Sequence, residues 1–216
     1  MKLLAFELST EGCSVAAWVD GEVCERFETA PRRHAELALP WADDVLREAG
    51  VARTELDAIA VGRGPGAFTG VRLAIAVAQG IALALQARAP RVLAAIDARM
   101  GEVYVAAFRC DGDNAVLLDP ERVVAPDRVE LPDDADDWVG VGTGFDANEV
   151  ALRARLGARF TRIDANALPR ASDVARLGAQ ALKRGEGVAA ERVEPAYLRD
   201  NVALTLAEQR ALKARR

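Results

Sequence analysis

The stretch Leu3-Leu4-Ala5-Phe6-Glu7, an apolar run closed by an acidic residue, begins the first strand that the sequence predicts. Two turn dipeptides, Glu11-Gly12 and Asp20-Gly21, divide the following residues into further short runs. Short apolar or alternating runs between turn residues are typical of strands. We therefore expect an antiparallel meander of three strands, in the ranges Leu3–Leu8, Cys13–Val19 and Glu22–Glu28.

A second apolar run closed by an acidic residue, Leu93-Ala94-Ala95-Ile96-Asp97, lies 90 residues after the first. At that offset Glu7 falls on Asp97. Identical residues also coincide, namely Leu3 with Leu93, Ala5 with Ala95, Val15 with Val105, Ala16 with Ala106 and Ala17 with Ala107. At an offset of 80, Gly62 and Gly64 fall on Gly142 and Gly144. Each half therefore reads as a strand with a terminal acid, two more strands and later a strand that ends in Gly-x-Gly, which predicts an internal duplication.

Apolar periodicity predicts the remaining elements. A helix is expected from about Arg33 to Ala49, and Pro40 inside it is expected to kink or split the helix. Further strands are predicted at Asp57–Gly62, Val92–Asp97, Glu102–Arg109, near Ala115–Leu118 and at Trp138–Gly142. Further helices are predicted at Gly70–Leu85, Asn148–Leu156, Ala171–Arg184 and Ala203–Arg216.

Two half-repeats of this kind resemble the actin/hexokinase/Hsp70 superfamily. The resemblance implies an α/β fold of two duplicated domains, with mixed sheets flanked by helices and a nucleotide held between them. The first domain is expected at residues 1–86, joined by the C-terminal helix 203–216, and the second at residues 91–202. The acids that close the first strand of each half, Glu7 and Asp97, are expected at that cleft. The superfamily places another strand and helix where this chain is short, between about Ala82 and Gln86.

Composition limits the functional classes. The chain has 216 residues and a net charge of −5, whereas a protein that holds a long stretch of RNA alone should be basic. Any RNA contact is therefore expected to be shared with a partner. Three scattered cysteines without a Cys-x-x-Cys pair favour a reducing compartment. The most apolar run, Val71–Leu85, contains Arg72 and is too short to span a bilayer, so no membrane-spanning segment is expected.

The most glycine-rich stretch runs from Gly62 to Gly70 and precedes a predicted helix. Its glycines permit close approach of another group to the backbone, and Thr69 can cap the helix. It lacks the Gly-Lys-Ser/Thr ending of a Walker A loop and the acidic ribose ligand of a dinucleotide fingerprint. From the residues alone it is either a structural loop or a cradle for a phosphate, in which Gly64 and Gly66 would approach the ligand.

The helix predicted after this loop carries small residues four positions apart, at Gly70, Ala74, Ala78 and Ala82. A stripe of small side chains allows a second helix to approach closely. The neighbouring row, Leu73, Val77 and Ile81, is apolar as well. The helix is therefore either an interface for a partner or a fully buried helix of its own domain.

Three motifs resemble the TsaB/YeaZ family. They are the stretch from Gly62 to Arg72, the stretch Ile96-Asp97-Ala98-Arg99-Met100-Gly101-Glu102-Val103-Tyr104, and Pro195-x-Tyr197-Leu198-Arg199. The resemblance covers nearly the whole chain apart from the short stretch near Ala82. It implies a bacterial cytosolic scaffold that activates its paralogue TsaD, which transfers threonylcarbamoyl to adenosine 37 of tRNA. TsaE, an ATPase, is the implied second partner, and TsaC supplies the threonylcarbamoyl-adenylate.

The family forms heterodimers with TsaD, and homodimers when isolated, through helices of the first domain. The predicted helices at 33–49 and 70–85 match those elements. The expected interface residues are therefore Gly70, Ala74, Ala78, Ala82, Leu37 and Trp41. Contact with tRNA is expected only through the complex. The basic tail with Arg210, Lys213, Arg215 and Arg216 is either a tRNA contact or a solvated helix face.

Independent catalysis has little support in the residues. His34 is the single histidine, so no histidine pair for a metal exists, and no Gly-x-Ser-x-Gly is present for a glycopeptidase. No metal site and no cofactor of its own are expected. The carboxylates Glu7 and Asp97 leave one alternative, an autonomous kinase or carbamoyltransferase that uses Mg-ATP. The family usually has Asp where this chain has Glu7, and the added methylene moves the carboxylate by about 1.5 Å.

A nucleotide, ATP or ADP, is expected at most in the assembled complex. The candidate cleft residues are Glu7, Gly64, Gly66, Asp97, Arg99, Glu102, Gly142 and Gly144. The Gly142-Thr143-Gly144 loop is either an adenosine contact or a plain turn, and Arg99 and Glu102 either bind a nucleotide or pair across the domain junction.

Overall fold

A computed structural model of the chain describes residues 1–62, 91–111 and 114–193. The helices predicted at Gly70–Leu85 and Ala203–Arg216, and the glycine loop beyond Gly62, lie outside these residues. No helix in the described ranges is long and apolar enough to cross a membrane.

The first sheet has the strand order β3-β2-β1-β4. Its strands are β1 (Lys2–Glu7), β2 (Gly12–Val19), β3 (Glu22–Thr29) and β4 (Ala58–Val61). The first three strands pair antiparallel, which confirms the predicted meander, and β4 pairs parallel with β1. Asp20 and Gly21 at the tight turn between β2 and β3 both have positive φ, the backbone geometry that an Asp-Gly turn favours.

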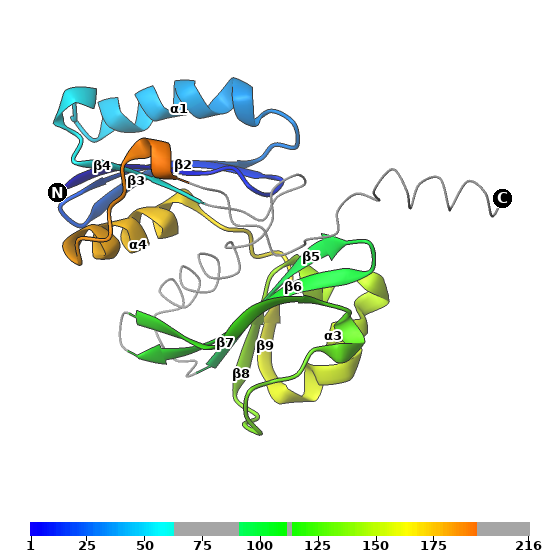
Figure 1. Cartoon of the computed structure of the whole chain (residues 1–216). Coiled ribbons are helices and arrows are strands. Elements are labelled where there is room, and N and C mark those ends of the chain that lie inside the picture. Colours follow the sequence, from blue (N-terminus) through cyan, green and yellow to red (C-terminus); the bar gives the residue numbers. More distant parts are fainter. Residues whose placement is uncertain (63–90, 112–113, 194–216) are drawn as a thin grey trace, which may run out of the picture.

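Among the residues that the structure describes, one helix covers each face of this sheet (Figure 1). On one face lies α1 (His34–Glu48), whose Ala38, Ala42 and Val45 pack against Leu4 and Val15. On the other face lies α4 (Ala171–Lys183), whose Ala171, Val174 and Ala175 pack against Ala5 and Ala16. The short 3-10 turn η1 (Arg53–Glu55) links α1 to β4.

The helix α1 is continuous through Pro40, so the predicted split at that residue is wrong. Proline removes one backbone hydrogen bond and leaves the carbonyl of Glu36 without its helical partner. Both Pro40 and Glu36 lie on the exposed side of α1. Water can satisfy the freed carbonyl there, which explains why the helix tolerates the proline.

The second sheet has the strand order β7-β6-β5-β8-β9. Its strands are β5 (Arg91–Arg99), β6 (Glu102–Asp111), β7 (Asn114–Val124), β8 (Trp138–Val141) and β9 (Phe160–Asp164). The sequence missed β9, a short strand whose Thr161 and Arg162 are exposed and which carries only Phe160 and Ile163 as large apolar residues. The strand predicted near Ala115–Leu118 is also longer in the structure, where β7 continues to Val124.

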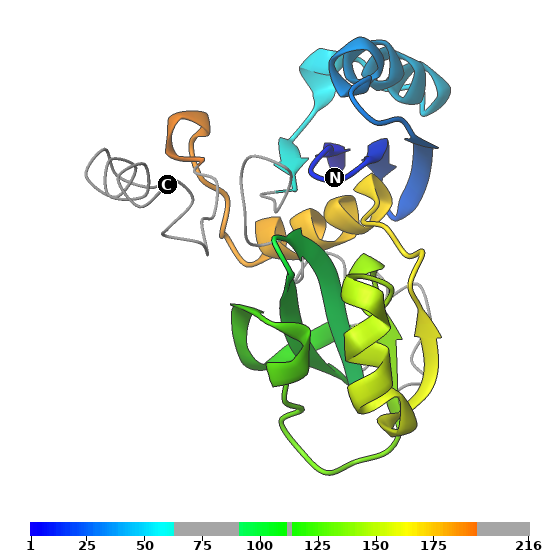
Figure 2. The same cartoon turned by 90° about the vertical axis from the view of Figure 1, so that its right-hand side faces the viewer.

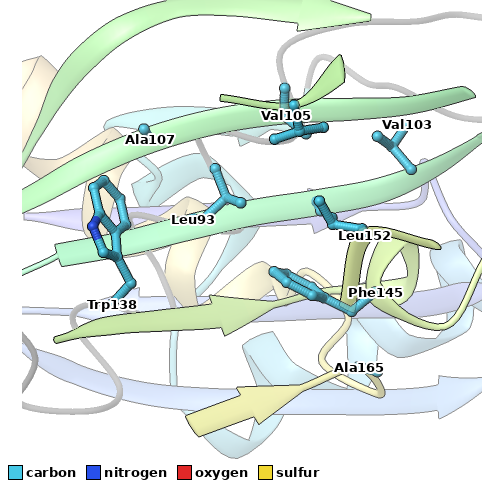
Figure 3. Close-up of a cluster of buried hydrophobic side chains, with 10 residues drawn as sticks. Leu93, Val103, Val105, Ala107, Trp138, Phe145, Leu152 and Ala165 are labelled. Carbon is cyan, nitrogen blue, oxygen red and sulfur yellow. The ribbon is translucent and has the colours of Figure 1, made fainter. Parts of the chain in front are cut away.

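The core of the second half lies between this sheet and the helix α3 (Ala151–Leu156). Trp138, Phe145 and Leu152 are fully buried there against Leu93 and Val105 (Figure 3). The ring of Phe145 also meets that of Phe160 edge to face, with centroids 5.2 Å apart. Short 3-10 turns connect the elements: η2 (Pro126–Arg128), η3 (Thr143–Phe145), η4 (Asn148–Val150), η5 (Gly157–Arg159) and η6 (Ala190–Arg192).

The helix predicted from Asn148 begins only at Ala151. Asn148, Glu149 and Val150 all have left-handed backbone angles, with φ of 50°, 56° and 58°. A left-handed turn cannot continue into a right-handed helix, so α3 starts after it.

The duplication appears in the strand order, because β3-β2-β1-β4 and β7-β6-β5-β8 repeat the same arrangement. The predicted register of the first strands is nevertheless wrong by one residue. Ala17 pairs with Leu4, and its counterpart Ala107 pairs with Leu93. All four lie on the faces covered by α1 and α3. Leu4, rather than Leu3, is therefore the counterpart of Leu93.

The domain boundary also differs from the prediction of a second domain at 91–202. The helix α4 follows β9 of the second sheet in the chain but packs on β1 and β2 of the first (Figure 2). Gly178 allows this close approach, because a β-carbon at that position would lie 2.8 Å from the β-carbon of Ala60. Residues 171–183 thus complete the core of the first sheet.

Candidate functional site

The carboxyl group of Glu7 is buried at the end of β1, and the residue has no exposed surface (0%). Its Oε1 accepts hydrogen bonds from the backbone N–H of Ser9 at 2.9 Å and from the Ser9 hydroxyl. Its Oε2 is buried and has no hydrogen-bond partner in the described part of the chain. Burial raises the pKa of Glu7, opposed by the hydrogen bonds from Ser9 and by the charge of His34. The site therefore favours the neutral carboxylic acid.

Gly62, just after β4, leaves the room that the Glu7 side chain occupies. The backbone N–H of Gly62 donates to the carbonyl of Phe6 at 2.9 Å, which fixes it beside β1. A β-carbon at position 62 would lie 1.8 Å from Glu7 Oε2 and 2.6 Å from its carboxyl carbon. The first glycine of the predicted loop therefore has a packing role toward Glu7.

The imidazole of His34 stands at the first residue of α1. Its Nε2 is buried without a hydrogen-bond partner among the described residues. It acts electrostatically on Glu7, so it belongs to the surroundings of that carboxyl. It has no hydrogen bond to a serine that would make it the base of a hydrolase in the described ranges.

Asp97 in the second half is more accessible than Glu7, with a side-chain exposure of 23%. The register explains the difference. Glu7 pairs with Ser14 and Ile96 pairs with Tyr104, so Ile96 is the counterpart of Glu7 and Asp97 lies one residue further along its strand. Successive side chains of a strand point to opposite faces. The two acids are therefore not equivalent, and the predicted alignment of Glu7 with Asp97 is corrected accordingly.

A short hairpin turn holds the carboxylate of Asp97. Its Oδ1 accepts from the backbone N–H of Arg99 and its Oδ2 from Arg99 Nη1, both at 2.8 Å. In the strand pairing of β5 with β6, the backbone of Arg99 lies opposite that of Glu102 across the turn. Arg99, Met100 and Gly101 all have positive φ. Of the predicted cleft residues, Asp97, Arg99 and Glu102 are thus brought together.

The loop after β8 lies against the end of β5. Gly142 has φ of 102°, and a β-carbon there would lie 2.4 Å from the carbonyl oxygen of Ala95. Gly144 also lies against this strand, because a β-carbon there would lie 2.8 Å from the carbonyl carbon of Ala95. The hydroxyl of Thr143 accepts a hydrogen bond from the backbone N–H of Asp97 at 3.2 Å. Both glycines are required by contact with the strand β5, which favours the turn over the adenosine contact.

The sequence did not indicate Ser9, which holds Glu7, and it indicated Thr143 only as part of the Gly142–Gly144 loop, without its hydrogen bond to the backbone of Asp97. No hydrogen bond or ion pair joins the two acids in the described ranges, and there no group of three His, Cys, Asp or Glu residues is arranged to hold a metal ion. A buried Glu7, whose Oε1 accepts from Ser9 and whose carboxyl group lies against Gly62, does not fit the water shell of a metal. Gly64 and Gly66 lie outside the described residues.

The predicted interface residues of α1 lie on its half-buried side. Leu37 and Trp41 are partly exposed, and Trp41 also packs against the core below α1. Leu39 is 73% exposed, the most exposed large apolar residue of this helix. The prediction did not include Leu39, although its place beside Pro40 in an apolar run marks it in the sequence. Gly70, Ala74, Ala78 and Ala82 lie outside the described residues.

Two sheets that share a four-strand order, with α1 and α4 packed on the first and α3 on the second, define a duplicated α/β protein of the actin/hexokinase/Hsp70-like class. The structure is similar to that of YeaZ from Pseudomonas aeruginosa, with a TM-score of 0.74, 44% identity and coverage of 91% of this chain and 99% of that chain. A crystal structure from the same organism, described as a protein with similarity to peptidase YeaZ, has a TM-score of 0.77 and 45% identity over 92% of this chain and 99% of that chain.

The tRNA threonylcarbamoyladenosine biosynthesis protein TsaB of Escherichia coli K12 is 40% identical over 94% of this chain and 96% of its own length. TsaB of Haemophilus influenzae is 33% identical over 94% of this chain and 95% of its own length. The model of TsaD, tRNA N6-adenosine threonylcarbamoyltransferase, matches residues 28–88. The chain belongs to the TsaB/YeaZ family. The E. coli comparison spans 227 aligned positions, more than the 216 residues of this chain, so that relative contains residues that this chain lacks.

Proposed function

We propose that this chain is a scaffold subunit that activates a TsaD-type enzyme for threonylcarbamoyl transfer to adenosine 37 of tRNA, without catalysis of its own. The observation that carries the proposal is the similarity to TsaB proteins over nearly the full length of both chains. The proposal places the chain in the cytoplasm, with TsaD and TsaE as partners, a homodimer in isolation, and tRNA contacted only through the complex.

The match to the transferase model supports a paralogous pairing. Residues 28–88 cover α1, β4 and the predicted interface helix, so the segment shared with TsaD includes both predicted interface elements. A transferase from Nitratidesulfovibrio vulgaris is 52% identical over 56 residues, which are 26% of this chain and 16% of that protein. Helices with a common origin can pair about a local two-fold axis, as identical helices do in a homodimer.

The state of Glu7 favours the scaffold over the alternative, an autonomous Mg-ATP enzyme. A carboxyl that is buried and whose Oε1 is already bonded to Ser9 is a poor ligand for a hydrated cation. We therefore assign no cofactor to the isolated chain and propose ATP or ADP binding only in the assembled complex. His34 as the single histidine, with a buried Nε2, gives no support to a peptidase.

Reconstitution tests the proposal. TsaD, TsaE, threonylcarbamoyl-adenylate, ATP and a tRNA that reads codons beginning with A are incubated with and without this chain, and modified adenosine is measured by nucleoside mass spectrometry. We expect product only when TsaD and this chain are both present. Product from this chain without TsaD, or equal product from TsaD without it, would overturn the proposal. Titration of the isolated chain with Mg-ATP in a calorimeter should give no heat, whereas micromolar binding would favour the autonomous enzyme.

A further inference from the structure

The first turn of α4 is joined to the first sheet by residues far away in the sequence. Oε1 of Glu25, in β3, accepts hydrogen bonds from the backbone N–H of Ser172 at 3.0 Å and from the Ser14 hydroxyl at 2.8 Å. The oxygen of Ser14 in turn accepts from the backbone N–H of Ala171 at 2.9 Å. The first N–H groups of a helix have no partner within it. Here the first sheet supplies those partners to a helix that follows the second sheet.

Arg170 strengthens the same junction from the residue before α4. Its Nε donates to Oε2 of Glu25 at 3.0 Å, so both oxygens of that carboxylate are used. Its guanidinium carbon also lies 4.3 Å from the centroid of the Phe27 ring, within cation–π range. The junction is therefore an ion pair with a fixed geometry.

Asp173, in the same turn, is a buried acid that takes no part in these hydrogen bonds to Glu25 and Ser14. It is 4% exposed, and Arg176 Nη1 donates to its Oδ1 at 3.0 Å. Burial raises the pKa of Asp173 to about 6, with Arg176 opposing the rise, Glu25 adding to it and Arg170 opposing it. Two acids and two guanidinium groups thus face one another at the point where α4 meets β3.

We propose that this turn is a charge-controlled latch between the two halves of the chain, closed when Asp173 is neutral and loosened when Asp173 is ionised. The neutral acid leaves Arg170 and the backbone N–H groups to Glu25. The ionised acid places a second negative charge beside Glu25 in a buried turn. The latch acts on α4, a helix that belongs to the second half in sequence and to the first half in packing.

The direction of the pH dependence follows from proton binding. In an undocked α4 the pKa of Asp173 returns to its ordinary 3.8, against about 6 in the docked helix. The undocked state therefore binds fewer protons between these values, and docking weakens as the pH rises from 3.8 to 6 and is constant above. A difference of about 2 pKa units changes the docking equilibrium on the order of 100-fold.

Hydrogen exchange on the intact chain tests the latch. Opening of α4 is measured at pH 5 and pH 7 as a ratio to opening of α1 in the same sample, so that the intrinsic exchange rates cancel. We expect the ratio to rise roughly 10-fold in the wild-type chain and to stay constant in Asp173→Asn. A constant ratio in the wild-type chain would overturn the proposal even if the Asn variant failed to fold. A rise that persists in Asp173→Asn would overturn it as well.

A second variant tests how the charge of Glu25 contributes to the pH dependence. With Glu25→Gln the amide oxygen still accepts from Ser172, but the negative charge next to Asp173 is gone. The pH at which α4 loosens should then shift downward. The matched control is Glu22→Gln, which removes an exposed charge from the same strand and should leave the profile unchanged. An unchanged midpoint in Glu25→Gln would contradict the pairing of the two acids.

Discussion

Glu7 and Gly62 share one space, because a β-carbon at position 62 would lie 1.8 Å from Glu7 Oε2. The Glu7 side chain folds back to Ser9 and fills the room beside the end of β4. The glycine at the head of the loop motif is thus tied to the acid at the end of β1.

Gly62→Ala should destabilise the chain by about 1–3 kcal/mol, because the new methyl group overpacks a buried carboxyl. In a Glu7→Asp background the same substitution should cost less, since the shorter acid withdraws from the methyl. A double-mutant cycle by denaturant unfolding should give a coupling of about 1 kcal/mol or more. Gly157→Ala is the control, because its β-carbon would lie 3.8 Å from Arg153 Cγ, an ordinary contact. Additive effects of the two substitutions would refute the shared space.

Glu7→Gln should change how stability depends on pH. The pKa of Glu7 is raised in the folded chain by burial, so the folded chain holds the proton at pH values where the unfolded chain has lost it. This contribution is therefore largest below the ordinary pKa of 4.5 and is lost as the pH rises from there through the raised value. Subtracting the unfolding free energy of Glu7→Gln from that of the wild-type chain should give a difference that falls with pH above 4.5. A flat difference curve would show that Glu7 titrates normally.

Val150→Asn should stabilise the chain by about 1 kcal/mol. Val150 has φ of 58° and ψ of 27°, a left-handed conformation that a β-branched residue rarely adopts. Asn tolerates this conformation better, and Val150 is 42% exposed, so little packing is lost. The midpoint of thermal unfolding measures the gain. Val188→Asn, at an exposed valine without positive φ, should not stabilise; equal gains at both sites would rule out relief of strain.

Thr143→Val should cost about 0.5–1.5 kcal/mol, because the backbone N–H of Asp97 loses its acceptor at the end of β5. Thr143→Ser keeps the hydroxyl and should restore most of the stability. Chemical denaturation of the two variants gives the comparison. If Val and Ser have the same effect, the hydrogen bond does not hold the Gly142–Gly144 loop in place.

Much of the sheet topology could be predicted from the sequence, because turn dipeptides and apolar runs separate the strands clearly. The register between the two halves could not be predicted. Leu3 and Leu93 are identical, yet Leu4 is the true counterpart of Leu93, since apolar residues coincide easily and only the pairing with Ala17 and Ala107 decides the face. That single residue determines why Glu7 is buried and Asp97 is accessible.

The helix α4 shows a second limit of sequence reasoning. Its amphipathic pattern predicted the helix with an error of one residue at its C-terminal end. The sheet on which α4 packs could not be predicted. The residues that accept from its first N–H groups, Ser14 and Glu25, lie about 150 residues earlier and carry no local signal for a helix cap. The candidate cleft residues were identified by motif, whereas the hydrogen bonds of Ser9 and Thr143 were visible only once the strands were paired.

The most direct test of the central claim is complex formation with TsaD, measured by gel filtration with light scattering. The wild-type chain should form a heterodimer with TsaD. Leu37→Asp and Ala78→Arg, at two of the predicted interface residues, should each abolish the heterodimer, while Glu22→Gln should not. Modification of tRNA by TsaD should fall in parallel. A heterodimer that survives both interface substitutions, or tRNA modification that persists without the heterodimer, would contradict the account.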